Sequence, residues 1–219
     1  MTVAPIGLGT FARFGLVVLA LLALVPTNPA GARHTSSAAP HDRAGPIDLT
    51  GRLLVAAPDM PDPRFARTVI FMVRHDASGA MGIVVNRLMA RGPLAKLLEG
   101  FGVEDPDVEG DINVYYGGPV EPQLGFVLHT ADYVGEHTIR VRSGVALTTD
   151  IEILSAISAG KGPRLSLFAM GYAGWAAGQL ERELMEGGWI VVDADEGLLF
   201  DSDLATKWDR ALAKRGVDL

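Results

Sequence analysis

Short apolar runs separated by turn-forming residues are the feature that most restricts how this chain can fold. Leu53–Ala57 is rich in aliphatic side chains and stops at Pro58, and Thr68–Val73 and Met81–Val85 are rich in β-branched residues. The turn-forming residues 76–79 lie between the last two runs, which predicts a hairpin. We therefore expect these three segments to be neighbouring strands of one sheet.

The rest of the chain alternates similar runs with segments whose apolar residues recur at helical spacing. Additional strands are predicted at Val114–Tyr116, Phe126–His129, Thr138–Val141, Leu165–Met170, Trp189–Val192 and Leu198–Phe200. Helices are predicted after Pro93, after a capping pattern formed by Thr149 and Glu152, after Trp175, and after a cap at Ser202. This mixture predicts one α/β domain, of the mixed α+β kind, over residues 51–219.

Residues 1–46 are a different kind of sequence. Arg13 precedes an apolar run, Phe14–Val25, and small residues follow at 30–32, which is the order of a secretory signal. We expect residues 1–32 to be a signal peptide or N-terminal hydrophobic segment and residues 33–50 to be a flexible linker. Cleavage would leave an exported or periplasmic protein, whereas an uncleaved segment would be its only membrane contact. The alternative is a mis-assigned translation start and a cytoplasmic protein.

The glycine-rich segment Leu165–Met185 is the most suggestive of a site, because an apolar strand runs through GYAGW into an amphipathic helix. Free amides at the start of a helix can hold an anion. The segment is not a Walker loop or GxGxxG, and it lacks the serine of GxSxG. The interpretation that we favour is structural: Gly171, Gly174 and Gly178 allow a tight turn and close helix packing.

Side chains beside this segment are candidate ligand contacts. Tyr172, Trp175 and Gln179 would add polar and aromatic groups to a cleft for a planar or polar ligand. A tryptophan near the start of a helix more often packs into the core, so Trp175 has a structural alternative.

A second group of candidates follows the neighbouring strands. Asn86 and Arg87 come directly after Met81–Val85, and the Gly117-Gly118 turn follows Val114–Tyr116. An amide and a guanidinium at a strand end could point into a shared crevice near Gly171. A surface ion pair is an equally good interpretation of Arg87.

Catalytic groups are harder to identify. His75 with Asp76 resembles half of a catalytic pair, but Asp76 belongs to a hairpin turn. His129 ends a strand, where a lone histidine is usually structural. Glu181 and the scattered aspartates, among them Asp59, Asp62, Asp193 and Asp195, lack any spacing that would raise a carboxyl pKa. We assign no catalytic residue.

Composition excludes several classes of function. The chain has no cysteine, so it forms no disulfide, thiolate zinc site or thiol nucleophile, and its five histidines lack ligand spacing. We expect neither a metal nor a cofactor. Residues 1–46 carry a net charge of +2, from Arg13, Arg33 and Arg43 against Asp42. Because the whole chain has a net charge of −7, residues 47–219 carry −9. That body repels a phosphate backbone, and direct DNA binding is not expected.

A set of motifs in a fixed order resembles the YqgE/AlgH family. They are GRLLVAAPDMPDPRFARTVIFMVRHDASGAMGIVVNR (51–87), GGPV (117–120), GFVLH (125–129), LTTD (147–150), GYAGWAAGQLE (171–181) and LLFD (198–201). The resemblance implies a single domain with a strongly curved, partly bifurcated mixed sheet flanked by helices. It also implies a bacterial protein without an established activity, some relatives being labelled transcriptional regulators. Leu88 stands where relatives usually have proline.

Three functions follow from these observations. We favour a non-enzymatic binding or regulatory protein that takes a small ligand or a protein partner in a crevice near Asn86, Gly117 and Gly171. An enzyme whose acid or base is His75, His129, Glu181 or one of the scattered aspartates is the second hypothesis. A cytosolic transcriptional regulator is the third, and it requires residues 1–32 not to be a signal.

Overall fold

The computed structural model describes residues 48–105 and 107–216. They belong to one compact unit, Ala44–Leu219. The predicted signal segment and most of the predicted linker lie outside the described residues. Among the helices that the structure describes, none has the length and apolar character needed to cross a bilayer.

Five antiparallel strands form the first part of the sheet, in the order β10-β1-β2-β3-β9. Their bounds are β1 Arg52–Ala56, β2 Val69–Asp76, β3 Gly79–Val84, β9 Ser166–Ala176 and β10 Trp189–Asp193. The predicted hairpin between β2 and β3 is confirmed, and the Asp76 carboxylate accepts the Ser78 amide at 2.7 Å in its turn. The first three predicted strands are therefore neighbours, as expected.

The second part of the sheet shares β9 with the first part. Its other strands are β4 Leu88–Pro93, β5 Asp111–Tyr116, β6 Val120–Thr130, β7 Thr138–Arg140 and β8 Val145–Thr148. The order β9-β6-β8-β7 continues the sheet on one side, while β5 pairs with both β9 and β4. The β5–β9 pair is parallel and the others are antiparallel, which gives the expected mixed sheet. Neither β4 nor β8 was predicted from the sequence.

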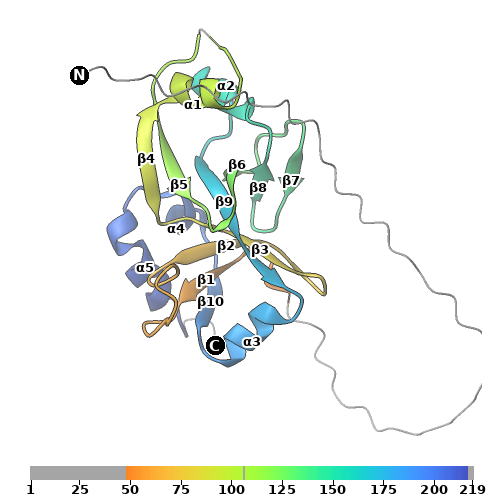
Figure 1. The fold of residues 1–219 in the computed structure, drawn as a ribbon, viewed down its shortest axis with the longest axis vertical. Coiled ribbons are helices and arrows are strands. Elements are labelled where there is room, and N and C mark those ends of the chain that lie inside the picture. The colour runs from red at the N-terminus through yellow and green to blue at the C-terminus, as the bar shows by residue number, and fades with distance from the viewer. Residues whose placement is uncertain (1–47, 106, 217–219) are drawn as a thin grey trace, which may run out of the picture. The chain divides into compact units, whose positions relative to one another are not determined.

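Strand β9 changes partners along its length, and this change produces the bifurcated sheet (Figure 1). Its first half, Ser166–Met170, lies between β5 and β6, whereas Ala173–Ala176 pairs with β3. At the change, the Gly117 amide donates to Met170 O at 2.8 Å and the Val84 amide donates to Gly117 O at 2.9 Å. Gly117 therefore connects β9 to β3 where the two parts of the sheet separate.

Glycine is required at this crossing because the backbones almost touch. Gly171 has φ +71°, and a Cβ built there would lie 2.5 Å from Gly118 O. A Cβ at Gly117 would lie 2.2 Å from Gly171 O, and one at Gly118 would lie 2.1 Å from the Tyr172 carbonyl carbon. We refer to Gly117, Gly118 and Gly171 as the glycine crossing.

The predicted turn from strand to helix at Gly171–Trp175 is therefore wrong. These residues continue β9, and the chain turns only at Ala177–Gly178, where Gly178 has φ +74°. Gly174 is exposed and is not among the glycines with positive φ. The prediction failed because glycines that allow a strand crossing and glycines that allow a turn look alike in a single sequence.

Five helices cover the sheet in the described part of the chain: α1 Leu94–Gly100, α2 Ile153–Ser158, α3 Gln179–Met185, α4 Glu196–Phe200 and α5 Leu204–Ala213. The helix after Pro93 is confirmed, and Leu94 and Leu98 are its buried residues. Helix α2 is present without the predicted capping box: Asp150 instead accepts the Glu152 amide at 3.0 Å.

Two predictions near the C-terminus are wrong. Leu198–Phe200 is part of helix α4 rather than a strand, because the Asp195 carboxylate caps the segment by accepting the Leu198 amide at 2.7 Å. Helix α5 is capped by Asp203, which accepts the Thr206 amide at 3.3 Å, and not by Ser202.

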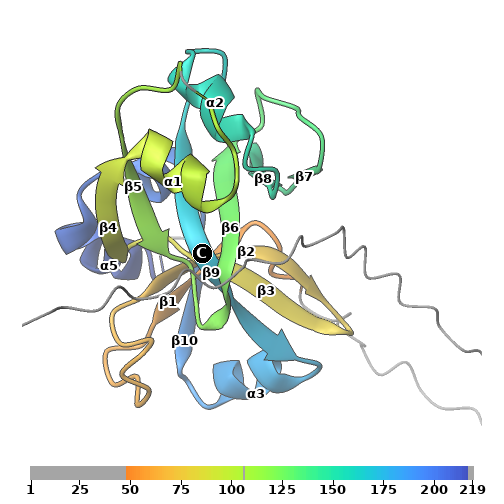
Figure 2. The same cartoon turned by 45° about the horizontal axis from the view of Figure 1, so that its top comes forward.

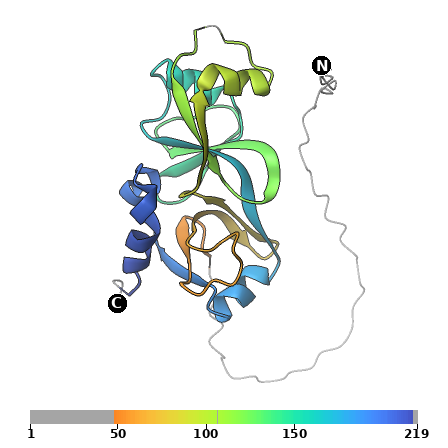
Figure 3. The ribbon, with the colours of Figure 1, turned by 60° about the vertical axis from the view of Figure 1, so that its left-hand side comes forward.

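The two faces of the first part of the sheet pack against different helices. Leu53, Val55 and Phe71 face Trp208 and Ala211 of α5, while the alternate residues of the same strands face Leu180 of α3. Figure 3 accordingly shows α5 and α3 on opposite sides of these strands. Helices α1 and α2 cover the other end of the sheet, over a third core (Figure 2).

The glycine crossing predicts unequal effects of alanine at two glycines with similar φ. Gly178 has φ +74°, but a Cβ added there would have nothing within 4 Å, so Gly178→Ala should cost about 1 kcal/mol of backbone strain. Gly171→Ala adds overlap with the backbone at Gly118 and should cost about 3 kcal/mol or more, up to failure to fold. Urea denaturation of both variants measures the difference. Equal losses of unfolding free energy would contradict the close approach.

Candidate functional site

A cleft lies between the loop 58–67, the end of β9, α3 and the start of β10. Its volume is about 440 Å³, within the range of small-ligand sites. Three of the predicted site residues, Gly174, Trp175 and Gln179, line it. The remaining lining residues are Met60, Pro61, Asp62, Arg64, Phe65, Pro119, Glu183, Glu186, Gly188 and Trp189.

The Glu183 carboxylate organises this cleft. Its Oε2 atom accepts the indole N–H of Trp175 at 2.9 Å and that of Trp189 at 2.8 Å. Its Oε1 atom accepts the Gln179 side-chain amide at 2.9 Å. One carboxylate on α3 thereby fixes a ring from β9 and a ring from β10. The two indoles meet edge to face with centroids 5.9 Å apart.

Helix α3 is placed so that these contacts form. The Gln179 side-chain carbonyl oxygen accepts the Ala176 amide at 3.1 Å, which closes the turn from β9 into the helix. Gln179 and Glu183 are four residues apart and so lie on one face of α3. Leu180 on another face is buried against the sheet.

The opposite wall is the loop 58–67, whose aromatic residue completes the cleft. Phe65 meets Trp189 edge to face at 5.6 Å. Arg67 holds the end of the loop, because its guanidinium lies 4.1 Å from the centre of the Trp208 ring and pairs with Asp209 at 2.8 Å. The loop is therefore attached both to the cleft and to helix α5.

Asn86 and Arg87 do not face a shared crevice with Gly171, contrary to the prediction. Asn86 accepts the Val69 amide at 2.9 Å and donates to Arg67 O at 2.9 Å. Arg87 donates to Ala66 O at 2.9 Å. Both side chains are occupied in holding the end of the loop, so they support the cleft without lining it.

The other predicted residues also lie outside the cleft. Gly117, Gly118 and Gly171 form the glycine crossing, where an added Cβ would overlap the neighbouring backbone, and none of the three lines the cleft. The ring of Tyr172 packs edge to face on Phe126 at 5.9 Å, and burial raises the pKa of its hydroxyl. The prediction therefore identified one wall of the cleft and mistook the crossing for another.

Charge in the cleft is negative. Asp62 pairs with Arg64 at 2.7 Å, and the hydrogen bond from Arg64 lowers the pKa of that carboxyl. Glu183 and Glu186 have no such basic partner among the ion pairs of the described residues. With Arg64 as the one basic lining residue, the wall carries a formal charge of −2.

Both candidate histidines have their ring nitrogens occupied. His75 Nδ1 accepts the Leu49 amide at 3.2 Å, so Nε2 carries the proton and donates to Glu181 at 2.9 Å. His129 is fully buried, with Nδ1 against Thr130 O at 2.8 Å and Nε2 against the Thr148 hydroxyl at 2.8 Å. Burial lowers the pKa of His129. Neither ring presents a free lone pair to a substrate.

No group of three or more metal-ligating side chains occurs among residues 48–105 and 107–216. The predicted turn carboxylates serve local structure instead: Asp62 accepts the Arg64 amide at 2.9 Å, and Asp195 caps α4.

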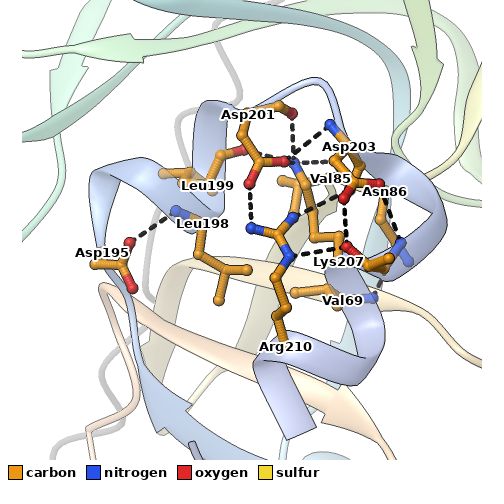
Figure 4. A network of polar contacts seen from close by, with 11 residues as sticks. Val69, Val85, Asn86, Asp195, Leu198, Leu199, Asp201, Asp203, Lys207 and Arg210 are labelled. Carbon is orange, nitrogen blue, oxygen red and sulfur yellow. Dashed lines mark hydrogen bonds and ion pairs between the residues drawn. The ribbon is translucent and has the colours of Figure 1, made fainter. Parts of the chain in front are cut away.

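Lys207 is a buried titratable group that the sequence analysis missed (Figure 4). Its side chain is 0% exposed, and Nζ donates to Val85 O at 3.3 Å, Leu199 O at 3.0 Å and Asp201 O at 3.1 Å. These contacts join α5 to α4 and to the end of β3. Burial lowers the pKa of Lys207 to about 8. No local pattern distinguishes this lysine from those on the exposed face of a helix.

The lowered pKa of Lys207 predicts a pH dependence of stability. Between about pH 8 and pH 10.5 the unfolded chain holds a proton on Lys207 that the folded chain has released, so unfolding becomes less favourable as pH rises. The unfolding free energy of the wild type relative to Lys207→Met should rise across this window by up to about 3 kcal/mol. Denaturant titrations at several pH values measure it. If the difference in unfolding free energy between the two proteins did not change with pH, Lys207 would not be a buried lysine with a lowered pKa.

Comparison with known proteins agrees with this architecture. The fold is that of a single-domain mixed α/β protein. A family model described as AlgH-like matches residues 53–219. A UPF0301 protein of Methylococcus capsulatus is 45% identical over 80% of this chain and 96% of the relative. One from Caulobacter vibrioides is 50% identical over 77% of this chain and 88% of the relative. The chain belongs to the AlgH-like, or UPF0301 (YqgE/AlgH), family.

Solved structures confirm the fold. The solution structure of the AlgH protein from Pseudomonas aeruginosa has a TM-score of 0.68 and 40% identity, and covers 81% of this chain and 94% of that chain. The crystal structure of protein DIP2367 from Corynebacterium diphtheriae has a TM-score of 0.62 and 22% identity. At this identity, the similarity shows a shared fold alone. The single domain with a strongly curved mixed sheet expected from the resemblance is therefore confirmed, and the sheet is mostly antiparallel.

Proposed function

We propose that this chain is a non-enzymatic binding protein whose ligand occupies the cleft between loop 58–67, β9, α3 and β10. The observation that carries the proposal is the fixed carboxylate of Glu183 beside two indoles in a cavity of about 440 Å³. A preformed apolar cavity with a few fixed polar groups is the usual form of a small-ligand site.

The arrangement of the cleft supports binding rather than catalysis. Glu183 accepts three hydrogen bonds from neutral donors, and these bonds hold the carboxylate still. A general base exchanges a proton with the reacting group itself, and a hydroxyl or amine nucleophile needs such a base beside it. His75 and His129 lie outside the lining residues, and their ring nitrogens are already bonded.

The charge of the body disfavours direct DNA binding, which would begin with phosphate neutralisation. A regulatory role would then require the bound ligand or a protein partner to transmit the effect. Export through the N-terminal segment stays a prediction, and sequencing the N-terminus of the mature protein tests it.

The three tryptophans provide a direct test of the proposed site. The Trp175 and Trp189 indole N–H groups bond to Glu183 in the cleft, whereas the Trp208 N–H donates to Ala56 O at 2.9 Å on the other face of the sheet. In a screen of small molecules and short peptides by ¹H–¹⁵N correlation spectra, a ligand should shift the first two indole signals and leave the third unchanged.

Leucine substitutions provide the matched controls. Gly188 lines the cleft, and a Cβ added there would lie 3.4 Å from Glu183 O and 3.8 Å from the Met60 methyl group, so Gly188→Leu should fill the cleft beside Met60 and abolish the ligand-induced shifts. Ala176→Leu, at an exposed position of β9 outside the lining, should leave them unchanged. Ligands that shift only the Trp208 signal, or that bind Gly188→Leu as well as the wild type, would overturn the proposal.

A further inference from the structure

We propose that the cleft takes an organic cation, an ammonium or guanidinium group carried on an apolar stem. This inference rests on the proposed binding function and names the chemistry of the ligand. Three features carry it: the uncompensated charge of Glu183, its remaining capacity to accept a hydrogen bond, and the apolar surfaces beside it.

The charge of Glu183 is held but not neutralised. Its partners are two indole N–H groups and one carboxamide, all neutral donors. These donors fill acceptor positions of the carboxylate but do not cancel its negative charge. Asp62 differs, because the guanidinium of Arg64 both bonds to it and neutralises its charge. A cation bound in the cleft would be attracted to the Glu183 carboxylate, and water screens this attraction only in part.

Glu183 also has room for one further donor. A carboxylate offers about four acceptor positions on its two oxygens. Two bonds reach Oε2 and one reaches Oε1, so Oε1 retains one acceptor position. An ammonium or guanidinium N–H is the donor that gains most there, because both partners of the bond would be charged.

The remaining lining favours an apolar stem behind the charged group. Met60, Pro61, Phe65 and Pro119 supply hydrocarbon and aromatic surface, and the two indoles lie next to Glu183. Aromatic rings also attract cations through their quadrupole. Glu186 adds a second negative charge to the wall, and the one basic lining residue, Arg64, is paired with Asp62, so an anionic ligand would meet repulsion.

A matched series of three probes with the same hydrocarbon tests the sign of the charge. n-Hexylamine, 1-hexanol and hexanoate differ mainly in the charge of the head group at pH 7. In titrations followed through the Trp175 and Trp189 indole signals, hexylamine should bind at least ten-fold more tightly than hexanol, and hexanoate should not bind. The affinity for hexylamine should fall when sodium chloride is raised from 0.05 to 0.5 M.

Variants then test which carboxylate is responsible. Glu183→Gln keeps an acceptor oxygen for the indoles and removes the charge, so hexylamine affinity should fall at least ten-fold while hexanol affinity changes less than two-fold. Glu186→Gln, on the exposed wall, should lower hexylamine affinity less than three-fold. The Trp208 indole signal and the melting temperature report whether each variant is folded. If Glu183→Gln does not fold, the comparison of the three probes on the wild-type protein tests the inference.

The failures of the two proposals are distinguishable. Equal binding of hexylamine and hexanol, or undiminished hexylamine binding by folded Glu183→Gln, would overturn the cation inference and leave the cleft as a binding site. Hexanoate as the best of the three probes would overturn it in the same way. If no hexyl probe moves the two indole signals, the cation inference is wrong. If the wider screen also moves neither, the proposed function is wrong as well.

Discussion

The close contact of three glycine backbones is the constraint on which the rest of this structure depends. Where β9 passes the turn between β5 and β6, Gly117 donates to Met170 O and accepts the Val84 amide, so three strands are joined at one residue. Any Cβ at Gly117, Gly118 or Gly171 would overlap backbone atoms of the neighbouring segment. Because the strands meet this closely, β9 can pair with strands in both parts of the sheet. The segment beyond Gly171 then reaches the cleft, where Trp175 faces α3.

Local patterns in the sequence were sufficient for elements whose contacts are local. The β2–β3 hairpin, the strand β10 and the helix after Pro93 follow from apolar runs and from turn residues next to them. The glycine crossing was misread because its contacts join residues about 50 positions apart, which no local pattern encodes. Leu198–Phe200 was misread for a related reason: a three-residue apolar run does not distinguish a strand from a helix, and the cap by Asp195 decided it.

The candidate site was predicted in part. Gly174, Trp175 and Gln179 are on the cleft wall, as the glycine-rich segment indicated. Glu183 and Trp189 were missed, since a glutamate within the charged run 181–183 looks like a solvated helix face. Asn86 and Arg87 were assigned to a crevice, whereas they hold the backbone of the loop that forms the opposite wall. The contacts that matter here link β9, α3 and β10, and they exist only once the fold has formed.

In the proposed site, Glu183 binds the cationic group of the ligand, and the indole N–H groups of Trp175 and Trp189 hold its carboxylate in place. A crystal structure of the chain with bound n-hexylamine tests this proposal most directly. We predict that the ammonium nitrogen lies about 3 Å from a Glu183 carboxylate oxygen, with the alkyl chain running along Phe65. An alkyl chain in the cleft with its ammonium pointing to solvent, or an amine bound elsewhere on the protein, would contradict the proposal.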